Sequence, residues 1–430
     1  MTTLLRFAPS PTGLLHAGNV RTALVNFLFA QKTGGEFMLR IDDTDVERSK
    51  DEYIEAIKKD LAWLGITYNR TFKQSDRFAR YEEVKQQLIA AGKLYPCYET
   101  QEELDTKRKF QMKRGLPPIY DRGALKLTDA EKAAFDAAGK KPHYRFKLEP
   151  TDIVWNDMVR GETKFNGANL SDPILFREDG SLIYMLCSVV DDGDYKVTHI
   201  VRGEDHVTNT AIQIQIAQSL GYKMPEFAHI ALLKAKDGEL SKRVGGFDIG
   251  ALRDKGIEAQ AILSLLAKMG TSDAIDAKSM EELVAEFDFA KFGRATAIYN
   301  PEDLERLNHK VIAHLDYEKV KDRVKVDKNF WDAVKPNLKT VAEVAEWAEI
   351  CSDNLKPVVQ DAEFLKVAAG LLPDNLDFSA WMEAVKAATG KKGKDLFMPI
   401  RLALTAREHG PELKAILPLI GRERVLKRLG

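Results

Sequence analysis

Cysteine is scarce in this sequence. Among the 430 residues there are three cysteines, Cys97, Cys187 and Cys351, which lie far apart along the chain. An odd and scattered set excludes a disulfide framework and a four-thiolate zinc site, and it is typical of a reducing compartment. We therefore expect a cytoplasmic protein.

Long hydrophobic runs, low-complexity tracts and an excess of one charge are missing as well. No segment approaches the roughly 18 consecutive apolar residues of a membrane helix, and the residues up to Leu15 lack an export signal. The sequence has 64 Lys and Arg residues and 65 Asp and Glu residues, so the overall charge does not indicate nucleic-acid binding. Any basic binding surface must therefore be local. With 44% hydrophobic residues, the chain is expected to be soluble and to have material for two or more cores.

The first part of the chain alternates between strand and helix patterns. We expect a strand over residues 4–8, the breaker cluster 9–13, a helix over about 19–33 that stops at Gly34 and Gly35, a strand over 36–41 and a helix over about 51–64. This alternation predicts a parallel sheet with right-handed crossovers, in which ligands lie beyond the carboxyl ends of the strands.

The pattern changes twice further along. Between about residues 95 and 185, a basic helix near 107–114, a second helix over 129–138 and strand-like runs interrupt the alternation, and we interpret them as an insertion. From residue 184 through 205 the pattern returns to strand, turn and helix, with a buried strand over 197–201 and a helix after Asn209. Beyond about Pro301 only helical periodicity remains, which predicts an all-helical second part.

The first chemical motif lies where the first strand meets the first helix. It reads Arg6-Phe-Ala-Pro-Ser10-Pro-Thr-Gly13-Leu-Leu-His16-Ala-Gly18-Asn19. A helix start offers unpaired backbone N–H groups that suit phosphate, Gly18 lets the backbone approach a ligand, and His16 can donate to a phosphoryl oxygen. The alternative is an ordinary turn rich in proline and glycine.

A second motif, Gly238-Glu239-Leu240-Ser241-Lys242-Arg243, follows the apolar run 230–233. By itself this triplet of Ser, Lys and Arg fits a solvated surface turn better than a site. Paired with a histidine-glycine helix start, it fits the second half of a nucleotide clamp, in which Lys242 carries a mobile positive charge to a triphosphate.

Seven segments together resemble the bacterial-type glutamyl-tRNA synthetases, a family of class I aminoacyl-tRNA synthetases, over nearly the whole chain. They are residues 6–19 as a HIGH-type motif, Arg40-Ile-Asp42-Asp-Thr-Asp45, Gln74-Ser75-Asp-Arg77, Val189-Val-Asp191-Asp192, Val201-Arg202-Gly-Glu204-Asp205-His206, Asn209-Thr210, and Leu240-Ser241-Lys242-Arg243 as a KMSKS-type loop.

The resemblance implies an α/β fold in which a Rossmann-like, parallel-sheet catalytic domain carries an α/β insertion and is followed by an all-helical anticodon-binding region. On the sequence, the split catalytic domain would cover residues 1–94 and 186–235, the acceptor-stem-binding insertion 95–185, a connecting segment with the lysine loop 236–310, and the helical region 311–430.

The activity implied is that of a glutamate–tRNA ligase. L-Glutamate and ATP would form glutamyl-adenylate and pyrophosphate, and the 2′-hydroxyl of the terminal adenosine of tRNA(Glu) would then take the acyl group. Neither step needs a protein nucleophile, so catalysis must come from positioning and from donors aimed at developing charge. Mg²⁺ would accompany the triphosphate, and we expect the chain to act as a monomer without a membrane partner.

Individual roles follow from the positions that match the family. His16 and Lys242 are the implied catalytic residues. The implied substrate-binding residues are Arg6 and Arg202 toward the side-chain carboxylate, Ser10 and Asp42 toward the α-amino group, and Tyr184 in the pocket wall. The implied ATP-binding residues are Gly18, Asn19, Asp205, His206, Ser241, Lys242 and Arg243. For Arg202, a structural ion pair with Glu204 or Asp205 is the alternative.

Some positions depart from the family pattern. Certain relatives bind zinc in the insertion, but here Glu99 stands where a second cysteine would follow Cys97, and residues 120–126 supply neither cysteine nor histidine, so no zinc is expected. Glu239 replaces the usual first lysine of the loop, and Ser188 stands where some relatives have asparagine.

Several readings stay open. The basic residues of the insertion (Lys107, Arg108, Lys109, Lys113, Arg114) and of the C-terminal part (Lys391, Lys392, Lys394, Arg422, Arg424, Lys427, Arg428) suit tRNA phosphates or are ordinary solvated charges. The nearest alternative function is a form that charges tRNA(Gln) with glutamate, in addition or by preference. A small-molecule nucleotidyltransferase and a non-catalytic tRNA-binding protein are more distant alternatives.

Overall fold

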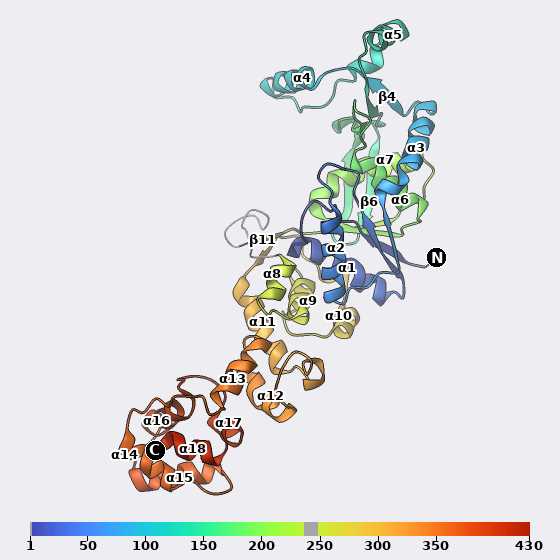
Figure 1. Cartoon of the computed structure of the whole chain (residues 1–430). Coiled ribbons are helices and arrows are strands. Elements are labelled where there is room, and N and C mark those ends of the chain that lie inside the picture. The colour runs from blue at the N-terminus through green and yellow to red at the C-terminus, as the bar shows by residue number, and fades with distance from the viewer. Residues whose placement is uncertain (1, 236–247) are drawn as a thin grey trace. The chain divides into compact units, whose positions relative to one another are not determined.

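The computed structural model describes residues 2–235 and 248–430, which belong to two compact units. The larger unit comprises Met1–Ala251 and Leu266–Tyr299, and the smaller unit comprises Leu252–Leu265 and Asn300–Gly430. Figure 1 shows the chain with its elements labelled.

A parallel sheet forms the centre of the larger unit. Strands β1 (Leu4–Phe7), β2 (Glu36–Ile41) and β3 (Arg70–Lys73) pair in parallel in that order, and β9 (His199–Gly203) and β10 (Glu226–Ile230) pair in parallel beside them. The two sets meet at β1, where the backbone N–H of Thr198 donates to the carbonyl of Leu4 at 3.0 Å. The associated helices are α1 (Ala17–Lys32), α2 (Asp51–Trp63), α3 (Phe78–Ala90), α6 (Tyr184–Asp194) and α7 (Val207–Ser219). The predicted parallel sheet is therefore confirmed.

The glycine pair after α1 shows why the chain turns where it does. Gly34 has a φ of +61°, which ends the helix, and a Cβ on Gly35 would lie 2.5 Å from the carbonyl oxygen of Thr3. Only a glycine can therefore bring the start of β2 this close to the residue before β1. Asn26, in the middle of α1, donates to the carbonyl of Val201 in β9 at 3.1 Å and fastens the helix to the sheet.

One element in this region was not anticipated. The expected strand over 197–201 corresponds to β9 (His199–Gly203) and the expected helix after Asn209 to α7, but residues 184–194 also form a helix, α6. The segment Met185–Asp192 is buried throughout, so its polar residues Ser188, Asp191 and Asp192 do not form a solvent-exposed face.

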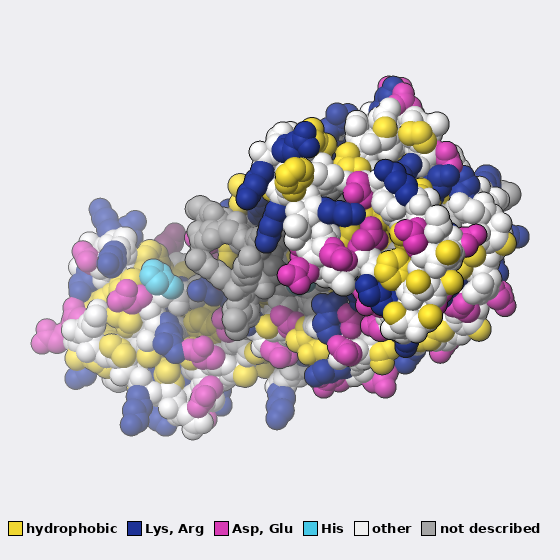
Figure 2. Space-filling view, turned by 90° about the horizontal axis from the view of Figure 1, so that it is seen from above, with side chains coloured by type: hydrophobic (Ala, Val, Ile, Leu, Met, Phe, Trp, Pro, Cys, Tyr) yellow, Lys and Arg dark blue, Asp and Glu magenta, His cyan; other side chains and the backbone are white. Residues whose placement is uncertain are grey.

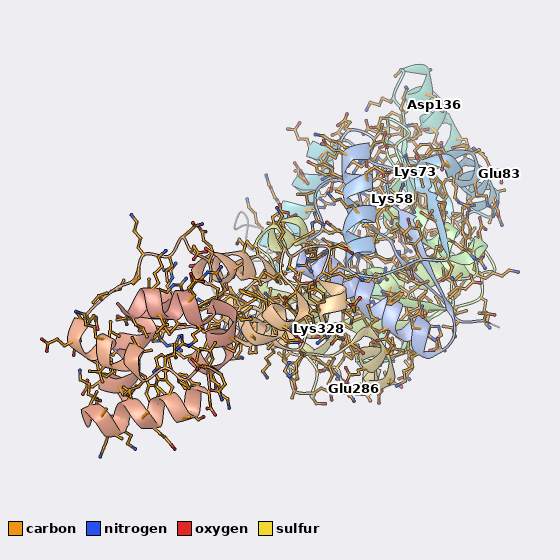
Figure 3. The ribbon with its side chains drawn as sticks, turned by 60° about the horizontal axis from the view of Figure 1, so that its bottom comes forward. Lys58, Lys73, Glu83, Asp136, Glu286 and Lys328 are labelled. Atoms are coloured by element: carbon orange, nitrogen blue, oxygen red, sulfur yellow. The ribbon has the colours of Figure 1, made fainter. Side chains whose placement is uncertain are left out.

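The segment between β3 and α6 builds an extension of the larger unit. Strands β4 (Leu94–Cys97), β5 (His143–Phe146) and β8 (Ile174–Phe176) form an antiparallel sheet. Helices α4 (Gln101–Lys113) and α5 (Asp129–Ala137) lie at the end of the unit that is remote from β1. Figure 3 shows that Asp136 on α5 lies apart from Lys58 on α2, one of the helices associated with the parallel sheet.

A hairpin within the same segment returns to the central sheet. Strands β6 (Asp152–Asp157) and β7 (Gly161–Asn166) are antiparallel, and β6 pairs in parallel with β10 at Asp157 and Phe227. Residues 152–166, which the sequence placed inside the insertion, thus lie at the edge of the catalytic sheet.

The larger unit is completed by α10 (Met280–Glu286) and by β11 (Leu233–Ala235), which pairs in parallel with β12 (Ala297–Tyr299). Helices α8 (Ile249–Asp254) and α9 (Ala259–Lys268) each contain residues of both units.

Helices make up the smaller unit, as the sequence predicts. They are α11 (Pro301–Ala313), α12 (Lys328–Val334), α13 (Val344–Ile350), α14 (Ala362–Gly370), α15 (Phe378–Thr389), α16 (Lys394–Thr405), α17 (Leu413–Ile420) and α18 (Arg422–Leu429). They enclose one hydrophobic core, in which Trp331 and Trp381 are completely buried and donate to the carbonyls of Leu315 and Ala368.

The surface mixes both charges. Figure 2 shows basic and acidic side chains interspersed over the visible face, in agreement with the formal charge of −1. Among the described residues, no helix has the length and apolar character needed to cross a bilayer.

Candidate active site

A cavity of about 850 Å³ opens at the carboxyl ends of β1, β2, β9 and β10. This is the position that parallel α/β sheets offer to ligands. Every described residue that the sequence predicted for the site lines this cavity: Arg6, Ser10, His16, Gly18, Asn19, Asp42, Tyr184, Arg202, Asp205 and His206. The remaining three, Ser241, Lys242 and Arg243, lie outside the described residues.

His16 caps the amino terminus of α1. Its Nδ1 accepts from the backbone N–H of Gly18 at 3.2 Å, and its own backbone N–H donates to Oδ1 of Asn19 at 3.4 Å, which completes a capping box. Because Nδ1 is an acceptor, the proton of the neutral ring lies on Nε2. Burial lowers the pKa of His16 below its ordinary value, so the ring is neutral near pH 7 and offers Nε2–H as a donor.

Gly18 is required by the position of this imidazole. A Cβ at residue 18 would lie 3.1 Å from Cε1 and 3.2 Å from Nδ1 of His16. Any larger residue would therefore push the ring away from the start of the helix. The result is a helix terminus that is capped by the histidine and presents its Nε2–H as a donor at the positive end of the helix dipole, an arrangement that suits a phosphate chain.

Two arginines and two aspartates form a buried cluster on the other side of the cavity. Asp192 accepts from Nε of Arg6 at 3.0 Å and from Nη1 of Arg40 at 2.9 Å, and Arg40 also holds Asp42 through Nε at 2.6 Å and Nη2 at 3.1 Å. Ser188 accepts from Nη2 of the same arginine at 3.2 Å. The two positive and two negative charges compensate one another.

Asp42 has an unusual titration. Burial raises the pKa of this carboxyl to about 6, although the adjacent Arg40 opposes the shift. At neutral pH the carboxylate is still the main form, and its oxygens can accept hydrogen bonds from an ammonium group in the cavity.

Arg202 differs from the other two arginines because no carboxylate contacts it directly, although Asp192 and Asp205 act on its charge from a longer distance. Its Nη2 donates to Oγ1 of Thr210 at 2.5 Å and to Oε1 of Gln213 at 2.7 Å, and its Nε donates to a nitrogen of His229. All three acceptors are neutral. Within the described ranges, no carboxylate forms an ion pair with Arg202, and Glu204 instead pairs with Arg160 at 2.8 Å. Burial and the neighbouring Arg6 lower the pKa of Arg202 to about 10.

The remaining wall of the cavity carries aromatic and polar groups. Asn209 donates to the hydroxyl of Tyr184 and lies 3.3 Å from Nδ1 of His206. Nε2 of His206 is 3.7 Å from Asp205, whose side chain is 56% exposed. The predicted residues Asp205 and His206 are therefore beside each other at the cavity edge.

The sequence did not single out three residues of this site. Arg40 and Asp192 lie within quoted segments, but nothing in a sequence shows that they meet across 152 positions. Arg21, one turn after His16, is almost fully buried, lines the cavity and donates to the carbonyls of Ala231 and Met269 at 2.6 and 2.8 Å. The only available signal was a charged residue on the apolar side of a helix.

The positions where some relatives carry zinc are occupied by a hydrogen-bonded set. Glu99 accepts hydrogen bonds from the hydroxyl of Tyr120 at 2.8 Å and from Nζ of Lys107 at 3.5 Å. Burial raises the pKa of Cys97 to about 12. A thiol that resists ionisation and a carboxylate already paired with a cation do not fit a zinc centre. Among the described residues, no group of three or more His, Cys, Asp or Glu side chains could hold a metal ion.

Comparison with known proteins agrees with this geometry. The catalytic-domain model of the class I tRNA synthetases (E and Q) matches residues 2–306, and an anticodon binding domain model matches residues 306–430. The chain belongs to the class I tRNA synthetases. The resemblance found in the sequence, including the predicted fold class, is thereby confirmed.

Several similar proteins are glutamate–tRNA ligases. Glutamate–tRNA ligase 1 of Rickettsia massiliae is 52% identical over 99% of this chain and 98% of its own length, and glutamate–tRNA ligase 2 of Orientia tsutsugamushi is 52% identical over 100% and 99%. The solved structure of a glutamate tRNA ligase from Elizabethkingia meningosepticum, in complex with its amino acid, is 26% identical, covers 100% of this synthetase and 98% of that chain, and has a TM-score of 0.85.

Proposed function

We propose that this synthetase is a glutamate–tRNA ligase that activates L-glutamate with ATP and transfers it to the 2′-hydroxyl of the terminal adenosine of tRNA(Glu). The observation that carries the proposal is the Arg202 guanidinium in the cavity, which is held by neutral acceptors and forms no ion pair among the described residues. A buried cation beside neutral acceptors is unfavourable until an anion binds, so the cavity selects a ligand with a carboxylate.

The side-chain carboxylate of glutamate would bind between Arg202 and Arg6. In each of these guanidinium groups Nη1 has no hydrogen-bond partner among the described residues, whereas Nε and Nη2 are engaged. The two cations repel each other, which contributes to the lowered pKa of Arg202. A carboxylate placed between them removes the repulsion and gains two charge-assisted hydrogen bonds, which the neutral amide of glutamine cannot match.

The α-amino group would lie near Asp42 and Ser10, with Tyr184 in the adjacent wall. The ionised Asp42 is held in place by Arg40 and offers acceptors to an ammonium. The α-carboxylate of the substrate is then free to attack the α-phosphorus of ATP, because the other two charged groups have their own partners.

ATP would extend along the start of α1. The Nε2–H of His16 would hold phosphate oxygens as negative charge develops on them, and Gly18 and Asn19 would place the positive end of the helix dipole beside them. Asp205 and His206 would contact the adenosine end of the cavity, and Ser241, Lys242 and Arg243 would close the clamp. Mg²⁺ would be carried largely by phosphate oxygens and water.

The tRNA is assigned to the rest of the chain. We retain the ranges 95–185 for acceptor-stem binding, 236–310 for the connecting segment and 311–430 for anticodon binding as proposals, together with a monomeric state and a cytoplasmic location. Nothing in the cavity or in the names of the relatives favours tRNA(Gln) as the acceptor.

Aminoacylation tests the proposed function directly. Purified protein, unfractionated tRNA, ATP and Mg²⁺ should incorporate radiolabelled glutamate into tRNA and leave glutamine unused, and purified tRNA(Glu) should be charged in preference to tRNA(Gln). Charging with glutamine, or no charging with either amino acid, would contradict the proposal. Preferential charging of tRNA(Gln) would leave the chemistry intact and change the partner.

A further inference from the structure

Arg202 is held by a row of residues that crosses three strands. Arg202 on β9 lies directly opposite His229 on β10 in the parallel register, and Asp157 at the end of β6 pairs with β10 two residues before that histidine. Nε of Arg202 lies 3.4 Å from Nε2 of His229, and Nδ1 of His229 lies 2.5 Å from Oδ2 of Asp157. None of these contacts depends on a ligand.

Asp157 is fixed firmly enough to determine the state of the histidine. Its Oδ1 accepts from the backbone N–H groups of His229 at 3.1 Å, Val159 at 3.1 Å and Arg160 at 3.0 Å. Burial works against ionisation, but these hydrogen bonds and His229 outweigh it and lower the pKa of Asp157 to about 2. The group is therefore a carboxylate, which can only accept.

The tautomer of His229 follows from this contact. Because the carboxylate cannot donate, Nδ1 of the imidazole carries the proton and donates to Asp157. Burial lowers the pKa of His229, so the ring is neutral and Nε2 keeps its lone pair. That lone pair faces Nε of Arg202 and the hydroxyl of Thr210, which is 2.8 Å away.

We propose that Asp157 and His229 are positioning residues that set glutamate specificity: they hold the Arg202 guanidinium with Nη1 toward the cavity and leave it without a carboxylate in direct contact. A carboxylate in direct contact with Arg202 would fix the same geometry but would neutralise the cation. A neutral imidazole, oriented by a carboxylate one residue further away, fixes the geometry and preserves the charge for the substrate. The inference rests on the proposed function, because it assumes that Arg202 receives glutamate.

The structure supplies variants and a matched control. His229→Leu removes the acceptor, His229→Gln places an amide oxygen near the position of Nε2, and Asp157→Asn removes the charge that fixes the tautomer. Asp172 is the control because it is another buried aspartate of the same segment, 1% exposed, which accepts from Tyr95 at 2.6 Å and from the backbone of Leu148 at 3.0 Å without lining the cavity.

Steady-state tRNA charging should separate positioning from general destabilisation. We expect His229→Leu to raise the KM for glutamate by on the order of tenfold or more and to lower the glutamate-over-glutamine preference, while the KM for ATP stays near the wild-type value. His229→Gln should recover most of the loss, and Asp157→Asn should lie between the two. Asp172→Asn should change the KM for glutamate by less than about twofold, whatever it does to unfolding.

Two outcomes would overturn the assignment in an active wild-type enzyme. One is a folded His229→Leu or Asp157→Asn protein with wild-type KM and wild-type preference, and the other is an equal rise of KM in Asp172→Asn. If His229→Leu does not fold, the KM and the preference of the isosteric Asp157→Asn variant test the assignment. If Asp157→Asn does not fold, the same measurements on His229→Leu test it. A wild-type protein that does not charge tRNA with glutamate at all would instead refute the proposed function.

Discussion

Replacing Arg202 by methionine should separate substrate selection from protein stability. Methionine has a similar length and fills the space, but it removes the guanidinium from the cavity. For glutamate, the loss of one side of a buried ion pair costs about 3 to 5 kcal/mol, which corresponds to a fall of roughly 150- to 5,000-fold in kcat/KM. Glutamine has no side-chain charge, so kcat/KM for glutamine should fall much less. The ratio of kcat/KM for glutamate to that for glutamine should therefore decrease.

Stability should respond differently to the same substitution. Burial and the repulsion from Arg6 lower the pKa of Arg202 to about 10. A base whose pKa is lowered by folding destabilises the folded state at neutral pH, here by roughly 3 kcal/mol, and this cost disappears only as the pH rises through the folded-state pKa. The methionine variant removes that cost but leaves Thr210 and Gln213 without the donor that Arg202 supplied, a loss of about 1 to 3 kcal/mol, whereas His229 keeps the hydroxyl of Thr210. The two effects nearly cancel.

Two measurements check this reasoning. The first is kcat/KM for glutamate and for glutamine in tRNA charging, and the second is the free energy of unfolding in urea. A folded variant that retains the wild-type preference would refute the role of Arg202. A large loss of stability would show instead that the charge of this residue is compensated inside the protein.

Three further predictions concern the start of α1 and the carboxyl of Asp42. His16→Ala should slow glutamate-dependent, tRNA-supported ATP–pyrophosphate exchange by about 10²- to 10³-fold and cost only about 1 kcal/mol of stability through the lost cap, and near wild-type exchange would contradict its assignment. Gly18→Ala should reduce exchange because its Cβ displaces the ring of His16, while urea unfolding should show no loss of stability, and a fully active variant would disprove the steric argument. Since burial raises the pKa of Asp42 to about 6, protonation below that pH should weaken glutamate binding, so kcat/KM for glutamate should fall as the pH drops through 6. Asp42→Asn should flatten this part of the profile, and an unchanged break in the variant would assign it to another group, such as His16.

Local elements of the catalytic sheet could be predicted closely from sequence. Expected boundaries such as residues 36–41 for β2 agree because proline clusters, glycine stops and periodicity mark the ends of these elements. The helix α6 was not anticipated, and its residues Met185–Asp192 are all buried. Sequence patterns mark a helix most clearly by one solvent-exposed face, which this segment lacks.

Charges were harder to place than elements. The basic residues near the C-terminus suggested a local binding surface, but Arg424 pairs with Asp353 at 3.1 Å, Arg422 pairs with Asp374 at 3.0 Å, and buried Arg428 donates to the carbonyl of Leu404 at 2.6 Å. In the active site, the sequence identified Arg6 and Arg202 but not Arg40, Arg21 or the partners of these arginines. Whether a basic side chain binds a ligand or stabilises the fold depends on contacts between residues far apart in the sequence. A single sequence does not show these contacts.

The return of β6 to the sheet limits how this enzyme could be shortened. Excising the whole range 95–185 would delete the strand next to β10, leave backbone groups of that strand unpaired and remove Asp157 from behind His229. A miniaturised enzyme that keeps the β6–β7 hairpin and discards only the segment carrying α4 and α5 would retain the amino-acid pocket. Such a minimal version could report how much of the chemistry belongs to the pocket alone and how much is contributed by the discarded segment.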